Sequence, residues 1–549
     1  NQDKTQAYKA CVFYFHNFVV SLRTINKLNT MNKKINTILS ILLLAFPFMS
    51  VNDTIAQEAK KDIILRINMP ANCNDKLNTR VAEIHFRSSE HSFLKTIDIN
   101  KEYTYQDTIS LSEDTEVNLW VYSYRGYDAK IKFGNKEVKE IKAIKAKYID
   151  KIINIDLYPV SGNRHKYLFY SRDLENDKPY RIPAIAQTSS GTLLALSDYR
   201  PCGNDIGYGE VDIKIRRCKD LETWSREETV ADGKGEKGDL FSCGFGDVAI
   251  VADRESEEVL IMCVAGKQTF QTATLNKHNH MARIRSRNGG LDWSEPEDVT
   301  SMFMNVKGKY EPILPEVYSM FFASGRILQS KVFKAKGSKY YRLYAALLTN
   351  SAEGYVNYVV YSDDFGESWH LLGEGCVKGG DEAKIEELSN GNIVISSRKP
   401  HGRYYNIFSF TDFTLAKGVW DKAISSDKVA GGINVGGNSC NGEILKINAI
   451  RTSDNKACEL MLQSLPTGNN RTEVSIFFKE LDNNTVYTPT KFAEHWQKGM
   501  IVSDRGSAYS TMILQDDGRI GFLYEEEPND YCIVYISLSI EEITNGKYR

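Results

Sequence analysis

The octapeptide Ser-Asp-Asp-Phe-Gly-Glu-Ser-Trp at residues 362–369 decides the fold of this chain, because it fits the pattern Ser-x-Asp-x-Gly-x-Ser/Thr-Trp in full. Residues 286–293 (Ser-Arg-Asn-Gly-Gly-Leu-Asp-Trp) fit the same pattern with two substitutions, and residues 218–224 (Cys-Lys-Asp-Leu-Glu-Thr-Trp) are a shortened relative. In such a motif the Asp side chain accepts N–H groups of a turn, Gly takes a positive φ, and Trp packs between adjacent strands. We therefore predict three hairpin turns of one repeated β unit, with structural Asp and Trp residues.

The sequence around these repeats is strand-like from about Tyr167 to the C-terminus. Apolar runs at residues 192–196, 259–262, 392–395 and 533–536 are separated by Gly, Asn and Asp turns, and no long helical period interrupts them. Many strands of even length with a repeated unit favour a closed or radially repeated fold. We predict an all-β protein whose larger part is a β-propeller.

Residues 58–160 predict a separate, smaller β domain. Short apolar alternations occur at residues 62–67 and 117–122, and a β-sandwich is the natural architecture for such strands. Trp120, Tyr122 and Tyr124 share one strand parity and are expected on one face. An aromatic row of this kind either stacks on sugar rings or belongs to the core, and both interpretations stay open.

The N-terminal region has the pattern of a secretory signal. Met31 is followed by Lys33 and Lys34, an apolar run over residues 38–48, and small residues up to Ala56. We interpret residues 31–56 as a removed signal peptide and residues 1–30 as upstream, non-native sequence. The alternative is a membrane anchor, for which the apolar run is short. Export is therefore expected, with no integral membrane span left in the mature chain.

Composition narrows the class of protein. With 549 residues and 42% hydrophobic residues, the chain is long enough for two or more domains. Lys plus Arg number 69 and Asp plus Glu 71, a net charge of -2, which gives no reason to expect a nucleic-acid partner. Ten cysteines occur without zinc-finger spacing, and we expect most of them to be isolated buried thiols. No metal or cofactor is predicted, and a monomer is expected.

A second motif, Tyr-Arg-Ile-Pro at residues 180–183, stands before a predicted strand and ahead of the repeats. Together these motifs resemble the Arg-Ile-Pro motif and the Asp-boxes of bacterial sialidases, over roughly residues 165–545. The resemblance implies a six-bladed β-propeller over residues 165–549. It also implies a retaining exo-sialidase that removes terminal sialic acid from glycoproteins, glycolipids and oligosaccharides. Next to such a domain, the region at 58–160 is interpreted as a carbohydrate-binding domain.

The substrate that this resemblance implies carries a carboxylate on its anomeric carbon. Arginine suits such an anion because its planar guanidinium stays charged and pairs with carboxylate in a bidentate way. Arg181, Arg398 and Arg471 correspond to the arginine triad of the family. Arg451 is an alternative to Arg471, which has no close motif around it.

A tyrosine is the expected nucleophile, because a carboxylate would be repelled by the carboxylate of the substrate. Sialidases are a known exception to the two-carboxylate scheme of glycosidases. Tyr509 lies in a segment that resembles the family's nucleophile region, and Glu382 is the expected base that takes the phenolic proton. Glu386 and Glu387 are alternative bases. Glu525 matches the carboxylate that holds the first arginine in place, whereas Glu526 and Glu527 are expected to be solvated neighbours.

Asp205, on a glycine-flanked loop, is the expected acid that protonates the leaving oxygen and later activates water. Asp212, on the following strand, is its alternative. Arg200 and Asp247 are expected as further substrate-binding residues. Three rival functions share these motifs: a trans-sialidase, a catalytically inactive sialic-acid-binding propeller, and a structural propeller. The last two have no need for Asp205, Glu382 and Tyr509 together.

Overall fold

The computed structural model describes residues 59–69, 80–98, 104–170, 179–437, 439–482, 484–527 and 531–549. The predicted upstream segment and signal peptide, residues 1–30 and 31–56, lie outside the described residues. Strands dominate the described chain, and its α-helices are short: α2 (Thr300–Phe303), α3 (Pro489–Ala493) and α4 (Ile540–Ile543). The prediction of an all-β fold is confirmed. Over the same residues, no helix has both the length and the apolar character needed to cross a membrane.

The first nine strands form two sheets that share one hydrophobic core. One sheet has the order β4-β1-β9-β6-β7 and the other the order β3-β2-β5-β8. Apolar side chains of both, such as Leu65, Ile155, Ile84 and Leu119, are buried in one cluster. The strands are β1 (Lys60–Asn68), β2 (Arg80–Arg87), β3 (Ser92–Asp98), β4 (Thr104–Ser112), β5 (Glu116–Ser123), β6 (Tyr127–Phe133), β7 (Lys136–Val138), β8 (Glu140–Lys145) and β9 (Ile152–Pro159).

The predicted aromatic row is present only in part. Trp120 and Tyr122 alternate with the buried Val117 and Leu119 on β5, so they point away from the core. The Trp120 ring is stacked on His85 at 4.8 Å between centroids. The prediction is wrong for Tyr124, because β5 ends at Ser123 and the Tyr124 ring turns into the interior.

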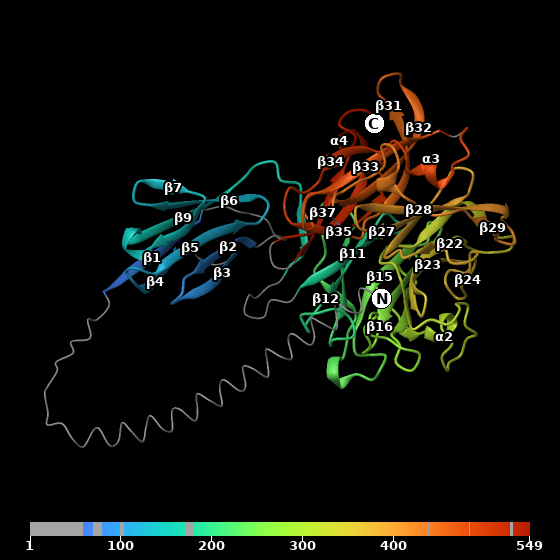
Figure 1. The fold of residues 1–549 in the computed structure, drawn as a ribbon, viewed down its shortest axis with the longest axis horizontal. Coiled ribbons are helices and arrows are strands. Elements are labelled where there is room, and N and C mark those ends of the chain that lie inside the picture. The colour runs from blue at the N-terminus through green and yellow to red at the C-terminus, as the bar shows by residue number, and fades with distance from the viewer. Residues whose placement is uncertain are drawn as a thin grey trace, which may run out of the picture. The chain divides into compact units, whose positions relative to one another are not determined.

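Residues 166–538 contain six sheets among the described residues, each built mainly from antiparallel neighbours (Figure 1). The first sheet joins β11 (Tyr180–Gln187), β12 (Leu193–Tyr199), β13 (Asp212–Cys218) and β14 (Glu228–Ala231). The second joins β15 (Phe245–Ala252), β16 (Val259–Ala265), β17 (His280–Ser286), β18 (Glu297–Asp298) and β20 (Gly325–Arg326). The third joins β19 (Ser319–Phe322), β21 (Leu328–Lys334), β22 (Tyr341–Ser351), β23 (Gly354–Ser362), β24 (His370–Leu371) and β25 (Val377–Lys378).

The three remaining sheets follow in the same manner. The fourth joins β26 (Ala383–Glu387), β27 (Ile393–Lys399), β28 (Gly402–Asp412), β29 (Lys417–Trp420) and β30 (Ile424–Ser425). The fifth joins β31 (Ile444–Arg451), β32 (Lys456–Pro466), β33 (Val474–Leu481) and β34 (Gln497–Ile501). The sixth joins β35 (Ser507–Leu514), β36 (Ile520–Glu526) and β37 (Cys532–Leu538) to the early strand β10 (Lys166–Phe169). This last sheet thus ties the beginning of the region to its end.

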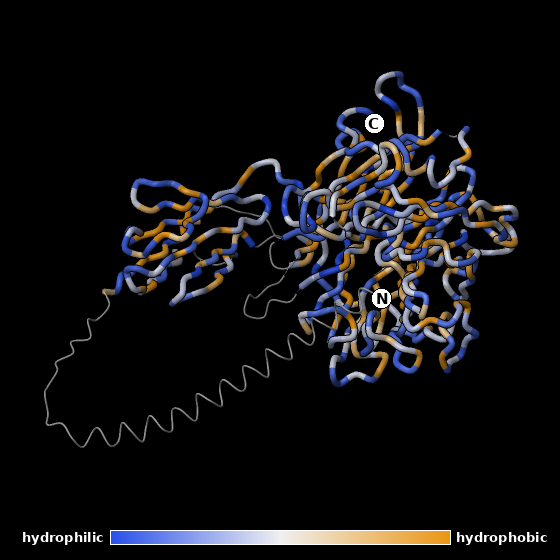
Figure 2. Tube along the Cα trace, viewed as in Figure 1, coloured by the Kyte–Doolittle hydropathy of each residue, from blue (hydrophilic) through white to orange (hydrophobic). Residues whose placement is uncertain are grey.

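The first strands of these sheets contact one another. Strand β11 contacts β15 and β35, β15 contacts β19, β21 contacts β26, and β31 contacts both β26 and β35. Most residues of β11, β15, β26 and β35 are buried, as expected for strands that are covered on both faces. Figure 2 shows hydrophobic residues along the strands and hydrophilic residues along many of their connections. The beginnings of the first strands therefore lie near one another, and so do their ends.

Each predicted repeat lies in a turn directly after a strand. Two follow β13 and β17, the third strands of their sheets, and the complete copy follows β23, which comes after β19, β21 and β22 in its sheet. In the complete copy the Asp364 carboxylate accepts the backbone N–H of Ser368 at 2.9 Å, and the Gly366 N–H donates to Ser362 Oγ at 2.8 Å. Gly366 has φ 80°, and Trp369 is 1% exposed within a core cluster. The predicted roles of Asp, Gly and Trp in the turn are confirmed for this copy.

The eight cysteines of the described chain are free thiols, and six of them are buried. This agrees with the expectation of isolated buried thiols for most cysteines.

Candidate active site

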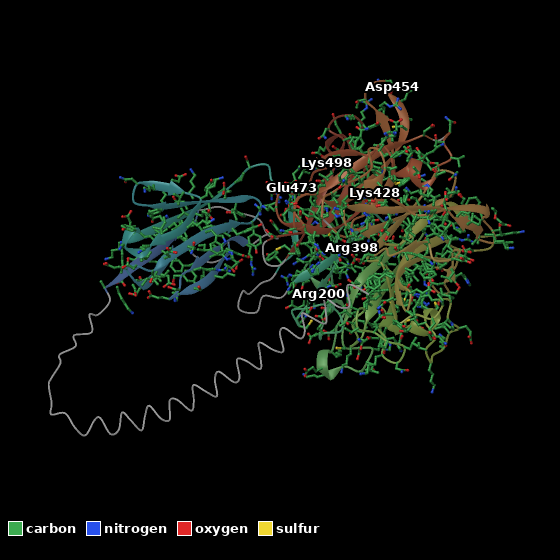
Figure 3. All side chains as sticks on the ribbon, viewed as in Figure 1. Arg200, Arg398, Lys428, Asp454, Glu473 and Lys498 are labelled. Carbon is green, nitrogen blue, oxygen red and sulfur yellow. The ribbon has the colours of Figure 1, made fainter. Side chains whose placement is uncertain are left out.

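The beginnings of the first strands surround a pocket of about 380 Å³. Eight of the nine predicted site residues line it: Arg181, Arg200, Asp205, Asp247, Glu382, Arg398, Arg471 and Tyr509. Figure 3 labels two of them, Arg200 and Arg398, which follow β12 and end β27. The ninth residue, Glu525, is fully buried behind Arg181.

Local backbone distortions turn several of these side chains into the pocket. The strand register shifts between Arg181 and Ala184 on β11, between Gly246 and Ala249 on β15, and between Ser507 and Ser510 on β35. Such bulges re-aim side chains and are common next to active sites. The left-handed φ values of Ile182 (60°), Asp247 (53°) and Arg471 (58°) are a further sign of backbone held in place by its surroundings.

Glu525 fixes the first arginine. Its carboxylate accepts Nε–H of Arg181 at 2.8 Å, the backbone N–H of Ile182 at 2.8 Å and the backbone N–H of Tyr509 at 3.0 Å. Burial opposes ionisation, but the Arg181 charge and these hydrogen bonds outweigh it and lower the pKa of Glu525. Glu525 therefore remains a carboxylate and orients both Arg181 and the backbone of Tyr509.

Arg398 joins Glu382 to Tyr509. One nitrogen, Nη1, donates to Glu382 Oε2 at 2.6 Å and to the Tyr509 hydroxyl at 2.8 Å. Its Nε donates to Ser439 Oγ at 3.1 Å and lies 3.3 Å from Asp381 Oδ2. The Tyr509 hydroxyl and the Glu382 carboxylate therefore accept hydrogen bonds from the same guanidinium nitrogen.

Three guanidinium groups surround the Tyr509 ring. Their central carbons lie 5.4 Å (Arg181), 5.9 Å (Arg398) and 5.7 Å (Arg471) from the ring centroid. Burial raises the pKa of Tyr509 well above its usual value, and Glu382 raises it further, while Arg398 and Arg181 act in the opposite sense. The phenol is therefore protonated near neutral pH.

Arg471 reaches the pocket from the connection between β32 and β33. Its backbone carbonyl accepts the N–H of Ser507, the first residue of β35, and this fixes the connection to the strand that carries Tyr509.

The opposite wall of the pocket is acidic. Asp205 is half-exposed on its loop, and its carboxylate lies 3.1 Å from Arg200 Nη2. The same nitrogen donates at 3.1 Å to Asp198, which is fully buried and also accepts the N–H of Asp247 at 3.0 Å. Burial, with the charges of neighbouring carboxylates, raises the pKa of both Asp198 and Asp247. Arg200 thus restrains Asp205 without enclosing it.

The alternatives to the predicted residues lie outside the pocket. Arg451 pairs with Glu480 and Asp454. Glu386 pairs with Arg326, and Glu387 accepts from Ser330 and the backbone of Lys331. Asp212 pairs with Lys214 and accepts the N–H of Gly233. Within the described chain, none of these four residues forms a hydrogen bond or ion pair with Tyr509 or Arg398.

Glu526 and Glu527 were both expected to be solvated. The prediction is wrong for Glu526, which is buried, whereas Glu527 is exposed as expected. The Glu526 carboxylate is fully buried because Arg125 donates to it at 2.8 Å and the hydroxyls of Tyr524 and Tyr167 at 3.0 Å each. An arginine 401 positions away along the chain could not be paired with it from sequence.

Three residues of the site were not predicted from sequence. Asp198 holds Arg200, Asp381 lies beside Arg398, and the Tyr531 ring lies 5.1 Å from the guanidinium carbon of Arg181. Asp381 precedes Glu382 directly, and this adjacency was the available signal. Asp198 lies two positions before Arg200, which was a second such signal. Tyr531 had none, because Arg181 comes from another part of the chain.

Taken together, the pocket can hold an anion and attack a carbon beside it. Arginine side chains supply the charge-assisted hydrogen bonds, each worth about 1.5–3 kcal/mol. A phenol with a neighbouring carboxylate supplies the nucleophile. Within the described ranges, no group of three or more His, Cys, Asp or Glu side chains is placed to hold a metal ion.

Comparison with known proteins agrees with this arrangement at the level of sialidases. The chain is 26% identical to a sialidase of Micromonospora viridifaciens over 358 residues, which cover 63% of the chain but only 50% of that relative. It is 22% identical to a sialidase of Paraclostridium sordellii over 372 residues, 66% of the chain and 86% of that relative. No protein-family model matches the chain.

Solved sialidase structures share the fold. A leech intramolecular trans-sialidase superposes with a TM-score of 0.55 at 14% identity, over 89% of this chain and 95% of the leech chain. At this identity the likeness concerns the fold alone.

Proposed function

We propose that the chain is an exo-sialidase that hydrolyses terminal sialic acid from glycans with retention of configuration, through a covalent sialyl-tyrosine intermediate. The proposal includes a six-bladed propeller as the catalytic domain, in line with the six sheets between residues 166 and 538. It also includes export by the predicted signal peptide and the action of the chain as a monomer.

The observation that carries the proposal is the placement of three guanidinium groups around the ring of Tyr509, at 5.4, 5.9 and 5.7 Å from its centroid. A sugar acid whose carboxylate pairs with these arginines brings its anomeric carbon to the phenol. The pocket offers a base as well as the arginines, because Glu382 and the Tyr509 oxygen both accept hydrogen bonds from Arg398. A protein that only bound the sugar would not need this base.

In the first step Asp205 gives its proton to the glycosidic oxygen, and the bond between that oxygen and the anomeric carbon breaks. The oxygen of Tyr509 forms a bond to the same carbon while its proton passes to Glu382. In the second step water attacks the anomeric carbon, Asp205 takes a proton from that water, and Tyr509 leaves and recovers its proton from Glu382. Two inversions give net retention.

Charge explains why a tyrosine suits this step. The substrate carboxylate would repel an anionic nucleophile, and a buried phenol stays neutral because burial raises its pKa. As the phenolic proton leaves, the positive charge of Arg398 at 2.8 Å stabilises the developing phenolate.

The test is hydrolysis of a fluorogenic sialoside by the wild type, Tyr509→Phe and Tyr531→Phe. Both tyrosine rings pack against Arg181, but only the Tyr509 hydroxyl meets Arg398 and has Glu382 beside it. We expect Tyr509→Phe to lose at least about 10²-fold in kcat, as for loss of a covalent nucleophile, and Tyr531→Phe to stay within about threefold. Full activity of Tyr509→Phe would overturn the proposed mechanism.

Product analysis separates hydrolysis from transfer. With an acceptor sugar present, free sialic acid should exceed transferred sialic acid, and its first-formed anomer should be the α form. A predominant transfer product would favour a trans-sialidase with the same residues.

Export is tested separately. The processed chain should be detected outside the cytoplasm of its source cells, and deletion of residues 31–56 should abolish this.

A further inference from the structure

A second concave site lies at the other end of the strands that carry the active site. Strands β11, β15 and β35 begin at the catalytic pocket, and their ends line a depression of about 400 Å³. From Arg181 to Gln187 on β11 the chain advances six residues, about 20 Å at the usual rise of a strand. The two sites are therefore separate.

The charged side chains that line this second depression are mostly cationic. Arg254, Arg326 and Lys331 line it, and the only carboxylate among its described lining residues is Asp516. Thr188 and Ser189 contribute hydroxyl groups at its rim. A concave site with this charge selects an anion.

Two of the three cations have no carboxylate partner among the ion pairs of the described chain. Arg254 instead lies with its guanidinium carbon 4.1 Å from the centroid of the Tyr341 ring, which holds it in place. Lys331 takes part in no described ion pair, although its own backbone N–H donates to Glu387. Arg326 donates through Nη2 to Glu386 at 2.9 Å and lies 3.8 Å from Glu443, but its buried Nε has no hydrogen-bond partner.

The cations also act against one another. Burial and the charges of Arg326, Lys446 and Arg254 lower the pKa of Lys331, while Glu386 opposes them. Lys446 is occupied by Ser389 and Glu459. A bound anion would relieve this repulsion, since it would interact favourably with every cation at once.

From this geometry we infer that the depression between the ends of β11, β15 and β35 is a binding site for a small doubly charged oxyanion, of the phosphate class, held by Arg254, Lys331 and Arg326. Guanidinium and ammonium groups pair with such oxygens through charge-assisted hydrogen bonds. The source is either inorganic phosphate or a phosphate monoester of a sugar. The site is independent of the proposed sialidase reaction.

Calorimetric titration of the full-length chain tests this inference, with inorganic phosphate and with glucose 6-phosphate as separate probes at constant ionic strength. The variants are Arg254→Ala and Lys331→Glu. Both side chains line the depression and reach solvent, and both changes leave the Arg326–Glu386 pair in place. Lys339→Ala is the matched control, because it removes a positive charge on the same sheet outside the depression.

We expect saturable binding of at least one probe by the wild type and by Lys339→Ala, with a thermal midpoint that rises with probe concentration. Arg254→Ala should bind about tenfold more weakly, and Lys331→Glu should not bind measurably. The probe that binds more tightly identifies the source. Absence of saturable binding to the wild type, or equal binding by all variants, would overturn the inference, whatever the sialidase activity is.

Discussion

The carboxylate of Glu525 accepts the Nε–H of Arg181 at 2.8 Å, although the two residues are 344 positions apart in the chain. The same carboxylate accepts the backbone N–H of Tyr509 at 3.0 Å. One fully buried group on β36 thus positions both Arg181, the proposed anion-binding arginine, and the strand that carries the proposed nucleophile. Its role is positioning, since Arg181 and Tyr509 line the pocket and Glu525 does not.

Glu525→Gln should therefore impair catalysis without any direct contact to substrate. The amide keeps the shape but loses the charge and presents an N–H₂ group to a donor, so Arg181 and β35 are expected to shift. A shift of about 1 Å at a reacting group costs about 10²-fold in rate, and we expect a loss of this order in kcat/KM. Steady-state kinetics with a fluorogenic sialoside measures it. Glu527→Gln, an exposed neighbour, is the control and should keep wild-type kinetics.

The same residue predicts how stability depends on acid. The folded-state pKa of Glu525 is lowered, so its contribution is present above the unfolded pKa of about 4.3 and is lost as pH falls through the folded pKa. Wild type should therefore lose more unfolding free energy than Glu525→Gln when the pH is taken from 6 to 3. Urea titrations at both pH values measure this difference. Parallel losses in the two proteins would contradict it.

Asp247 should change stability with pH in the opposite direction to Glu525. Its folded-state pKa is raised by burial and by Asp205 and Asp198, so its contribution to stability is full below the unfolded pKa and is lost as pH rises through the folded pKa. Asp247→Asn removes this titration, and Asn tolerates the left-handed φ of 53° at this position. The variant should have a thermal midpoint above that of wild type at pH 8 and about equal to it at pH 4. Its affinity for substrate should fall, because a pocket residue has changed.

The sequence predicted more of the site than of the contacts that hold it. Arg181, Glu382 and Tyr509 stand in motifs that resemble the family's, so they could be named before any coordinates. Asp198 was not, because its full role depends on the approach of β15 to β12, which brings the N–H of Asp247 to its carboxylate. The left-handed φ values at Asp247 and Arg471 have no signal of their own, since neither residue is glycine.

In the fold, too, features set by local sequence could be predicted, whereas features set by distant partners could not. Period-2 patterns and the three repeats indicate strands and turns, because they depend on local chemistry. The burial of Tyr124 depends on the point where β5 ends, and the burial of Glu526 depends on an arginine from the other end of the described chain. Tertiary partners decide such positions.

The complete repeat should contribute stability and not catalysis. In Asp364→Ala the backbone N–H of Ser368 and two serine hydroxyls lose their acceptor. Loss of a buried hydrogen-bond partner costs about 1–3 kcal/mol, and we expect that decrease in unfolding free energy with unchanged KM. Chemical denaturation and steady-state kinetics measure both. Glu353→Ala, an exposed change on the same sheet, is the control for stability.

Asp205 should reveal its role through the leaving group. Its carboxylate is half-exposed on a loop and is held by Arg200 at 3.1 Å and by the backbone N–H of Ile206 at 2.9 Å. Because it stays open to solvent, it can reach the glycosidic oxygen and exchange protons with water. An aryl leaving group of low pKa departs without protonation, whereas a sugar hydroxyl does not. Asp205→Ala should therefore lose about 10²–10⁴-fold in kcat/KM on a sialylated oligosaccharide and much less on the aryl sialoside. Asp212→Ala, which removes the buried Asp of β13 outside the pocket, should affect both substrates alike. Equal losses of Asp205→Ala on the two substrates would show that Asp205 is not the acid.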